Sequence, residues 1–324
     1  MGEMIKRIGV LTSGGDAPGM NAAIRSVVRT ALAQGLEVCG IQRGYNGLIH
    51  EEIVPLDIRS VADIIHLGGT MLYTARCDEF RTEAGQQKAV ETCRKYGIDG
   101  LVVIGGDGSF RGARALSLKG VPCVGIPGTI DNDISCTDYT IGFDTALNTA
   151  VDACDRLRDT SQSHDRCSVV EVMGNKAGHL ANAVCSACGG FACWVKETDF
   201  SVDTDIVEKM KTALEQDKHH FIVIVAENIT DVHKLAEEIE EKTGVETRAT
   251  VLGYIQRGGR PTAQDRIVAS RMGYHAVELL KEGIGNRVVV LHQSHVTDFD
   301  IQEALSMKKA LDTDLMNISH LLSR

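Results

Sequence analysis

Two short apolar runs, each ending in a loop rich in glycine and aspartate, constrain the fold of this chain more than any other feature. The runs cover residues 101–104 and 123–126, and they lead into GGDGS (105–109) and PGTIDND (127–133). Short apolar runs bounded by glycine and proline predict buried strands. In an open α/β sheet, ligands collect at the carboxyl ends of the strands, where glycine loops offer N–H groups to phosphate. The pattern therefore predicts a phosphate-binding edge of a sheet.

The carboxylates in these loops predict phosphoryl transfer, which needs a metal ion on the nucleotide, a base for the acceptor and cations for the moving phosphate. Asp131 and Asp133 stand two residues apart beside Thr129, so an extended loop would turn both carboxylates toward one cleft. One carboxylate would then act as the base while the other orients it. The alternative is an Asx-rich turn that caps the following helix.

A third glycine-rich segment, TSGGDAPGMN (12–21), ends the first predicted strand and opens a helix with proline near its first turn. It is either an anion cradle or a tight strand-to-helix turn. The GGDG segment also occurs in NAD kinases and lipid kinases, so it indicates phosphate or nucleotide without choosing between them. Arginines in four short, turn-associated segments could supply the cations: Arg76, Arg166, Arg248 and Arg257.

Strand-like and helical runs alternate along the chain in the βαβ rhythm of a mostly parallel sheet. Strands are expected at 8–12, 37–41, 101–104 and 121–126, with a helix at 18–34. A long helix from about 143 to 163 precedes further strands at 168–172, 221–226 and 247–252, which indicate a second α/β unit. A helix at 262–282, a strand at 287–291 and one polar helix from about 300 complete the pattern.

Composition limits the function and the cellular setting. The 324 residues suggest about two domains, and without a low-complexity linker the chain should cross between them more than once. A formal net charge of −10 argues against general nucleic-acid binding. The ten scattered cysteines are typical of reduced thiols. No membrane-spanning run or signal-peptide region is present, so we expect a cytoplasmic protein.

These segments together resemble the bacterial-type ATP-dependent 6-phosphofructokinases, from Arg7 into the C-terminal helix. The resemblance rests on IGVLTSGGDAPGMN, GGTMLYTARC, LVVIGGDGSF, PGTIDNDI, IGFDTALNT, EVMG, ETRATVLG and IQRGG. It implies transfer of the γ-phosphoryl group of ATP to the 1-hydroxyl of fructose 6-phosphate in glycolysis. It also implies two Rossmann-like α/β domains with the active site in the cleft between them. The ATP-binding domain would comprise 1–142 and 256–306, and the sugar-phosphate-binding domain 143–255 and 307–324.

The resemblance assigns roles to individual residues. Asp131 is implied to be the base, with Thr129 beside the transferred phosphoryl group, Asp133 supporting the loop and Asp107 contacting Mg²⁺. Arg76 would neutralise charge between donor and acceptor. The implied ATP-binding residues are Gly15, Tyr45, Arg76, Cys77, Gly106, Asp107, Gly108, Ser109 and Gly112. The implied sugar-phosphate residues are Thr129, Ile130, Asp131, Met173, Gly174, Asn175, Glu227, Tyr254 and Arg257, joined by Arg166 and Arg248 from a neighbouring subunit of a homotetramer.

Two departures make the implied sugar site less cationic. Asn175, followed by Lys176, stands where the family usually has arginine, and Tyr254 stands where it usually has histidine. Tyrosine can donate a hydrogen bond but cannot carry a positive charge. Affinity for the sugar phosphate or the rate should therefore fall unless Lys176 fills the gap.

The implied effector site departs further from the family, in which ADP activates and phosphoenolpyruvate inhibits at a subunit interface. Arg25, Arg29, Arg158 and Lys218 remain at matching positions. Phe191 falls where a metal-holding glutamate is expected, and Ile58, Gln216 and His219 replace basic residues. We expect weak or absent activation by ADP and weak or absent inhibition by phosphoenolpyruvate.

Two other functions remain open. The pyrophosphate-dependent form of the same fold typically carries Asp in place of a glycine of GGDG and Lys in place of the glycine of PGTIDND. Gly108 and Gly128 favour ATP, because small residues leave room for the α-phosphate. The other possibility, a catalytically weak regulatory or nucleotide-sensing subunit, is suggested by Asn175, Tyr254 and the altered effector site. Intact Asp107, Thr129, Asp131 and Arg76 weigh against it.

Overall fold

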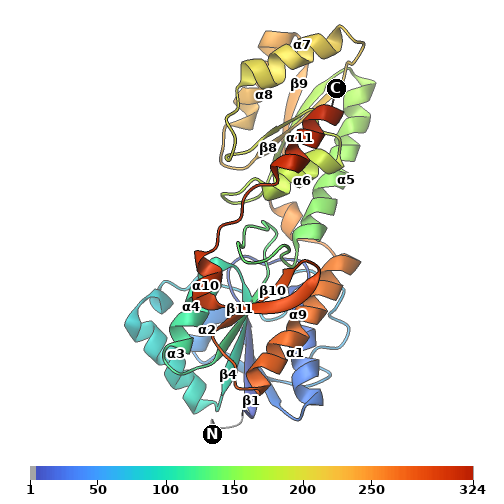
Figure 1. Cartoon of the computed structure of the whole chain (residues 1–324). Helices are drawn as coiled ribbons and strands as arrows, with labels where there is room; N and C mark the ends of the chain where they lie inside the picture. The colour runs from blue at the N-terminus through green and yellow to red at the C-terminus, as the bar shows by residue number, and fades with distance from the viewer. Residues whose placement is uncertain (1–4, 324) are drawn as a thin grey trace. The chain divides into compact units, whose positions relative to one another are not determined.

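The computed structural model describes residues 5–323, which form two compact units (Figure 1). Unit 1 comprises the chain up to Ile130, together with Ile134–Thr145 and Arg257–Lys309. Unit 2 comprises Asp131–Asp133, Ala146–Gln256 and the chain from Ala310. Each unit therefore draws on three separate stretches of sequence.

Unit 1 is built on a seven-stranded sheet in the order β11-β10-β5-β4-β1-β2-β3. The four strands β1, β2, β4 and β5 pair in parallel, and β10 pairs in parallel with β5. The two edge strands, β3 and β11, run antiparallel to their neighbours. The strands are β1 Arg7–Thr12, β2 Glu37–Ile41, β3 Ile53–Leu56, β4 Gly100–Gly105, β5 Cys123–Pro127, β10 Arg287–His292 and β11 His295–Asp300.

Helices cover both faces of this sheet (Figure 1). One face carries α2 Gly44–Ile49, α3 Glu83–Lys95, α4 Asp107–Ser117 and α10 Ile301–Ser306, whose apolar side chains pack with Leu11, Ile41 and Val103 in one buried cluster. The other face carries α1 Met20–Ala33 and α9 Ala263–Lys281, which lie side by side. Gly273 allows this approach, because a Cβ there would meet the Ser26 Cβ at 2.6 Å. A short 3-10 helix, Glu79–Arg81, precedes α3.

Unit 2 contains a four-stranded, all-parallel sheet in the order β7-β8-β6-β9. Its strands are β6 Cys167–Val172, β7 Ala192–Trp194, β8 Phe221–Ala226 and β9 Thr247–Val251. Val169, Val223 and Phe221 belong to its buried core. Its helices are α6 His179–Ala187, α7 Glu208–Leu214, α8 Val232–Thr243 and α11 Thr313–Leu322, with a π-helical turn at Val202–Val207 and a 3-10 turn at Gly253–Arg257. Helix α5, Phe143–Ser163, has its first turn in unit 1 and continues in unit 2.

The predicted elements agree with the structure except at the C-terminus. One polar helix was expected from about residue 300, whereas the structure has two, α10 and α11. Met307 adopts an extended conformation (ψ 161°) and ends α10. Asp312 then starts α11 as its N-cap, with its Oδ1 accepting a hydrogen bond from the Leu315 N–H at 2.9 Å. A capping aspartate satisfies N–H groups that a helix end leaves unpaired. This cap explains why a second helix begins after Asp312.

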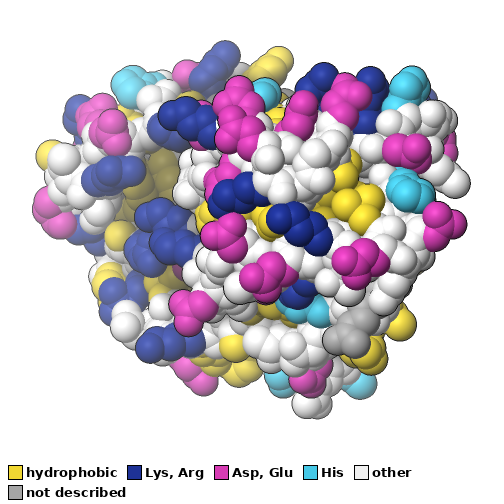
Figure 2. Space-filling model, turned by 90° about the horizontal axis from the view of Figure 1, so that it is seen from above, with side chains coloured by type: hydrophobic (Ala, Val, Ile, Leu, Met, Phe, Trp, Pro, Cys, Tyr) yellow, Lys and Arg dark blue, Asp and Glu magenta, His cyan; other side chains and the backbone are white. Residues whose placement is uncertain are grey.

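The surface carries charges of both signs, and most of the cysteines are buried. Figure 2 shows acidic and basic side chains interspersed over the face that it presents. All ten cysteines are free thiols, and nine of them are buried. Within residues 5–323, no helix combines the length and apolar character needed to cross a membrane.

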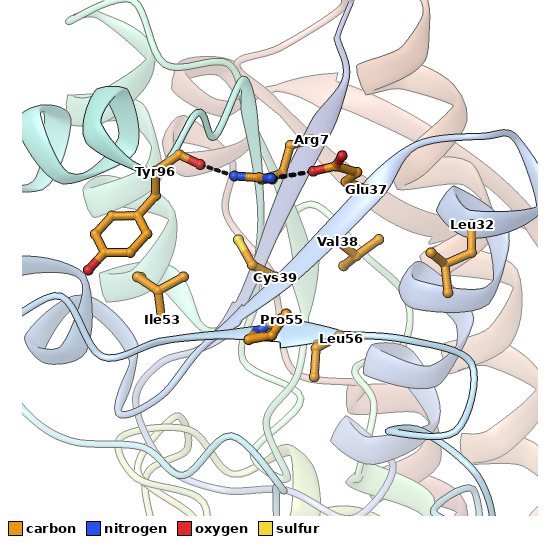
Figure 3. Close-up of a pocket in the computed structure, with 9 residues that line it drawn as sticks. All are labelled: Arg7, Leu32, Glu37, Val38, Cys39, Ile53, Pro55, Leu56 and Tyr96. Atoms are coloured by element: carbon orange, nitrogen blue, oxygen red, sulfur yellow. Dashed lines mark hydrogen bonds and ion pairs between the residues drawn. The ribbon is translucent and has the colours of Figure 1, made fainter.

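A pocket of about 360 Å³ lies in unit 1 beside the start of strands β1 and β2. Figure 3 shows Arg7 between the Tyr96 carbonyl and Glu37, with Cys39 and Ile53 among the other lining residues. The glycine-rich loops follow the opposite ends of the strands. None of the site residues predicted from the sequence lines this pocket.

Candidate active site

The three glycine-rich loops start next to one another in unit 1, because β1, β4 and β5 are neighbouring parallel strands. The Ser13 N–H donates to the Ile104 carbonyl at 2.9 Å, and the Gly128 N–H donates to the Gly105 carbonyl at 3.0 Å. These bonds continue the ladder past the strand ends and hold the starts of the loops in register. Such an edge is where ligands bind in open α/β sheets.

The first loop requires glycine for backbone reasons at two positions. Gly14 and Gly19 have φ values of +91° and +104°, which side chains rarely adopt. At Gly15 the reason is close approach, because an added Cβ would overlap the guanidinium group of Arg257. Arg257 Nη1 donates to the Asp16 carbonyl at 3.2 Å. The structure thus brings together Gly15 and Arg257, which were expected to bind different ligands.

The second loop opens helix α4, with Gly106 as its N-cap and the half-buried Asp107 as its first residue. The first-turn N–H groups of a helix and its dipole attract phosphate. Gly108 is exposed, and nothing lies within 4 Å of the position that its Cβ would take. Neither packing within the chain nor a positive φ therefore explains the glycine at 108.

Tyr45 packs against the second loop and forms a hydrogen bond with it. Its side chain is buried, its ring stacks on Phe80 with centroids 4.0 Å apart, and its hydroxyl donates to the Ser109 carbonyl at 2.6 Å. The Ser109 hydroxyl donates in turn to the Ser13 carbonyl at 3.1 Å, which ties the second loop to the first. Gly112 faces the Tyr45 ring, since a Cβ would come within 2.7 Å of it. Burial raises the pKa of Tyr45 well above its usual value, so the hydroxyl stays a neutral donor.

Arg76 and Cys77, the remaining residues expected on the ATP side, lie in the irregular segment before the 3-10 helix. Arg76 is exposed and Cys77 is half-buried. Nearby, the Thr74 hydroxyl donates to the Gly14 carbonyl at 2.7 Å. That bond fixes the segment to the first glycine loop.

The third loop corrects one expectation about its shape. An extended backbone was expected from 129 to 133, but the chain bends at Ile130 and Asp131, and Asn132 has a φ of +50°. Simple alternation of side chains therefore does not describe this loop. Asp131 is only 7% exposed, whereas Asp133 is half-buried. The Thr129 carbonyl accepts a hydrogen bond from the Thr140 hydroxyl at 2.7 Å.

In unit 2, four of the expected sugar-phosphate residues follow the ends of the parallel neighbours β6 and β8: Met173, Gly174, Asn175 and Glu227. Arg166 and Arg248 lie instead by the starts of β6 and β9. Glu227 Oε1 accepts hydrogen bonds from the N–H groups of Gly174 at 3.0 Å and Asn175 at 2.6 Å. Gln256, a fully buried residue that was not predicted as part of the site, accepts a hydrogen bond from the Met173 N–H at 3.2 Å. Asn175 adopts a φ of +58°, and both Asn175 and Lys176 are exposed.

Arg166 and Arg248 meet on one carboxylate, that of Glu246. Arg166 Nε lies 2.8 Å from Glu246 Oε2, and Arg248 Nη2 donates to Glu246 Oε1 at 2.6 Å. The close ion pair with Arg166, together with the positive charge of Arg248, lowers the pKa of Glu246. Glu246 was not predicted, although its place in ETRATVLG beside Arg248 was a usable signal.

Tyr254, another residue expected at the sugar phosphate, is 82% exposed.

The four expected effector residues form two pairs. Arg25 and Arg29 lie one turn apart on α1, and burial followed by the charge of Arg29 lowers the pKa of Arg25. In unit 2, Arg158 donates to the Cys188 and Gly189 carbonyls. Lys218 donates to the Ser323 carbonyl at 2.6 Å, and its ammonium lies 5.1 Å from the centroid of the Phe191 ring. Burial and Arg158 lower the pKa of Lys218.

The fold and these loops define a class: an α/β protein with clustered, glycine-rich strand ends suited to binding phosphate groups, and with carboxylates and arginines nearby. Residues 7–280 match the family described as phosphofructokinase. The chain is 55% identical over 320 residues to an ATP-dependent 6-phosphofructokinase of Clostridium botulinum (strain Loch Maree / Type A3), covering 99% of this chain and 100% of the relative. It is 53% identical to the enzyme of that name from Bacillus cytotoxicus, covering 98% and 100%.

Solved structures agree with the sequence relatives. The phosphofructokinase of Saccharomyces cerevisiae superposes with a TM-score of 0.87 at 31% identity, covering 98% of this chain and 48% of the yeast chain. The pyrophosphate-dependent phosphofructokinase of Marinobacter aquaeolei superposes with a TM-score of 0.84 at 21% identity, covering 96% and 86%, a likeness that shows the fold alone. This chain belongs to the phosphofructokinase family.

Proposed function

We propose that this chain transfers the γ-phosphoryl group of ATP to the 1-hydroxyl of fructose 6-phosphate, giving fructose 1,6-bisphosphate and ADP in glycolysis. The observation that carries the proposal is the 55% identity with a relative named ATP-dependent 6-phosphofructokinase over 99% of this chain and 100% of that relative. A match of that extent leaves no part of the relative without a counterpart here.

The ATP side of the reaction falls to the loops of unit 1. Phosphate oxygens would accept hydrogen bonds from N–H groups at the start of α4, and the Tyr45 contact with Ser109 supports that turn. Magnesium in nucleotide sites is usually held by one or two carboxylates together with phosphate oxygens. The single half-buried carboxylate of Asp107, in the first turn of α4, fits that set of donors. A bound Mg²⁺ would neutralise negative charge on the phosphates.

Asp131 is proposed as the general base that takes the proton of the 1-hydroxyl as the hydroxyl oxygen attacks phosphorus. Its near-complete burial suits a base that works away from bulk water. Thr129 would lie beside the transferred group, Asp133 would support the loop, and Arg76 would neutralise the charge that develops between donor and acceptor.

The sugar phosphate is assigned to Met173, Gly174, Glu227 and Arg257, with Arg166 and Arg248 supplied by a neighbouring subunit of a homotetramer. The shared carboxylate of Glu246 supports a joint role for these two arginines, because it holds both guanidinium groups in one place. Phosphate would compete with Glu246 for them. Asn175 and Tyr254 make this side less cationic than in the family.

Gly108 supports ATP over pyrophosphate as the phosphoryl donor. The space around its Cβ position is open, so the protein itself would accept a side chain there, and a bound nucleotide is the remaining reason for glycine. Gly128 discriminates less well. A Cβ there would meet Ile104 Cγ2 at 3.1 Å and Met20 Cε at 3.3 Å, so packing alone already favours glycine.

Regulation by ADP and phosphoenolpyruvate is proposed to be weak. Arg158 and Lys218 already have internal partners in the Cys188, Gly189 and Ser323 carbonyls, with which an anionic effector must compete. Phe191 offers no carboxylate for the metal of a nucleotide effector. The cytoplasm is the proposed location, in keeping with a glycolytic reaction.

Asp131→Asn tests the assigned mechanism. We expect kcat to fall by at least about 10²-fold, the usual scale for a general base, with a much smaller change in the KM for fructose 6-phosphate. Asp314→Asn makes the same chemical change at an exposed position on α11 and should leave kcat unchanged. Near-native turnover of Asp131→Asn would show that the base is another group.

A further inference from the structure

Asp265 is a fully buried carboxylate near the start of α9 that the proposed chemistry does not use. It accepts four hydrogen bonds from one short segment. The donors are the Tyr139 hydroxyl at 2.6 Å, the Gly142 N–H at 2.7 Å, the Thr145 N–H at 2.9 Å and the Thr145 hydroxyl at 2.5 Å. Each carboxylate oxygen accepts from one backbone N–H, Oδ1 from Gly142 and Oδ2 from Thr145, and an ionised carboxylate, which only accepts hydrogen bonds, suits this arrangement. Burial raises its pKa, and the four donors oppose that rise.

The segment that Asp265 holds lies directly against the third glycine loop. The Ile141 N–H donates to the Pro127 carbonyl at 3.0 Å, and Ile141 forms a parallel bridge with Gly128. The fully buried Thr140 adds its hydroxyl bond to the Thr129 carbonyl. The backbone of 127–129 is therefore fixed by the neighbours that Asp265 anchors.

The same segment also contacts the first glycine loop. A Cβ at Gly19 would lie 2.6 Å from Ile141 Cγ2 and 3.5 Å from the Asp265 Cβ, and a Cβ at Gly142 would lie 2.7 Å from the Ala17 Cβ. Gly19 and Gly142 both have positive φ values, +104° and +106°. Ile141 and Gly142 thus lie close to two of the predicted phosphate-binding loops, with no space for a Cβ at Gly19 or Gly142.

Stability alone does not explain a buried charged group, because apolar residues of similar size often stabilise a protein as well or better. The carboxylate instead orients its partners, because it accepts four hydrogen bonds from three residues of the segment 139–145. We propose that Asp265 and Thr140 are positioning residues that set the backbone of Thr129, two residues before the base in the chain, for phosphoryl transfer. This inference rests on the proposed function, because it assumes the roles of Thr129 and Asp131.

Thr140→Val tests the inference with the smallest change, since it removes the hydroxyl and keeps the shape. We expect kcat to fall about tenfold, because small misplacements at a reacting centre cost one to two orders of magnitude, while the KM for ATP changes less than about twofold. Thr140→Ser keeps the hydroxyl, so its kcat should stay close to that of the unsubstituted protein. Thr92→Val is the matched control: it removes a buried threonine hydroxyl that donates to the Lys88 carbonyl in α3 at 3.1 Å, and it should leave kcat unchanged.

Melting temperatures measured for the same variants separate positioning from loss of structure. Thr140→Val and Thr92→Val should melt at similar temperatures and differ only in kcat. Equal kcat values for these two variants, or equal impairment of Thr140→Ser and Thr140→Val, would overturn the inference. Asp265→Asn should lower kcat more than Thr140→Val, since it replaces one acceptor oxygen by a donor.

Asp131→Asn, assayed in parallel, keeps this inference apart from the proposed function. If Asp131→Asn is inactive and Thr140→Val turns over normally, the positioning role alone is wrong. If Asp131→Asn is active, the assigned base is wrong whatever Thr140 does.

Discussion

Replacing Tyr45 by phenylalanine should weaken ATP binding, although its hydroxyl is buried against the protein rather than directed at a ligand. The hydroxyl donates to the Ser109 carbonyl in the first turn of α4, and Ser109 connects that turn to Ser13. Removing the hydroxyl leaves the ring on Phe80 but takes one donor from a buried carbonyl, which costs about 1 to 2 kcal/mol. For a protein of this size, that loss lowers the melting temperature by about 1.5–3 °C.

The KM for ATP should rise about fivefold if about 1 kcal/mol of this loss appears as misalignment of the phosphate-binding turn. The KM for fructose 6-phosphate should stay within about twofold, because the expected sugar residues lie on other loops. Initial rates at varied ATP and at varied fructose 6-phosphate measure the two constants separately. Tyr274→Phe, at a 54% exposed tyrosine on α9, is the control and should change neither. An unchanged KM for ATP, or equal rises in both constants, would refute this account of Tyr45.

Three further predictions concern specificity and regulation. Asn175→Arg or Tyr254→His should lower the KM for fructose 6-phosphate or raise kcat, because charge-assisted hydrogen bonds to phosphate are stronger than neutral ones. If neither variant improves kcat/KM, the prediction is wrong, and Lys176 or another group compensates for the missing charge. Gly108→Asp should raise the KM for ATP without changing the melting temperature, since the position is open; a lower melting temperature would mean that packing requires the glycine. ADP or phosphoenolpyruvate at sub-saturating fructose 6-phosphate should shift half-saturation less than about twofold, because losing charge-assisted contacts costs about 1.5–3 kcal/mol each; a large shift at sub-millimolar effector would show a working site.

The sequence predicted those features that depend on local pattern. Apolar runs followed by glycine located β4 and β5, and their loops identified the phosphate-binding edge, because strand burial and backbone turns are encoded over a few neighbouring residues. Short or edge strands were missed. β7 has three residues and β3 has four, too few for periodicity to show, and β11 alternates polar residues in a way that also suits a loop.

Contacts between distant residues could not be predicted from local pattern. Asp265 meets Gly142 across 123 positions of sequence, and nothing around either residue indicates the other. The bend of the third loop depends on the left-handed conformation of Asn132, which asparagine tolerates but does not require. The pairing of Glu246 with both Arg166 and Arg248 depends on the register of β6 against β9, which the local sequence does not specify.

The identity of the phosphoryl donor tests the central claim most directly. Purified protein would be assayed with fructose 6-phosphate and Mg²⁺, and with either ATP or pyrophosphate, while fructose 1,6-bisphosphate formation is followed by a coupled reaction. We expect rapid turnover with ATP and none above background with pyrophosphate. Turnover with pyrophosphate alone would contradict the interpretation of Gly108, and no turnover with either donor would show a regulatory rather than a catalytic chain.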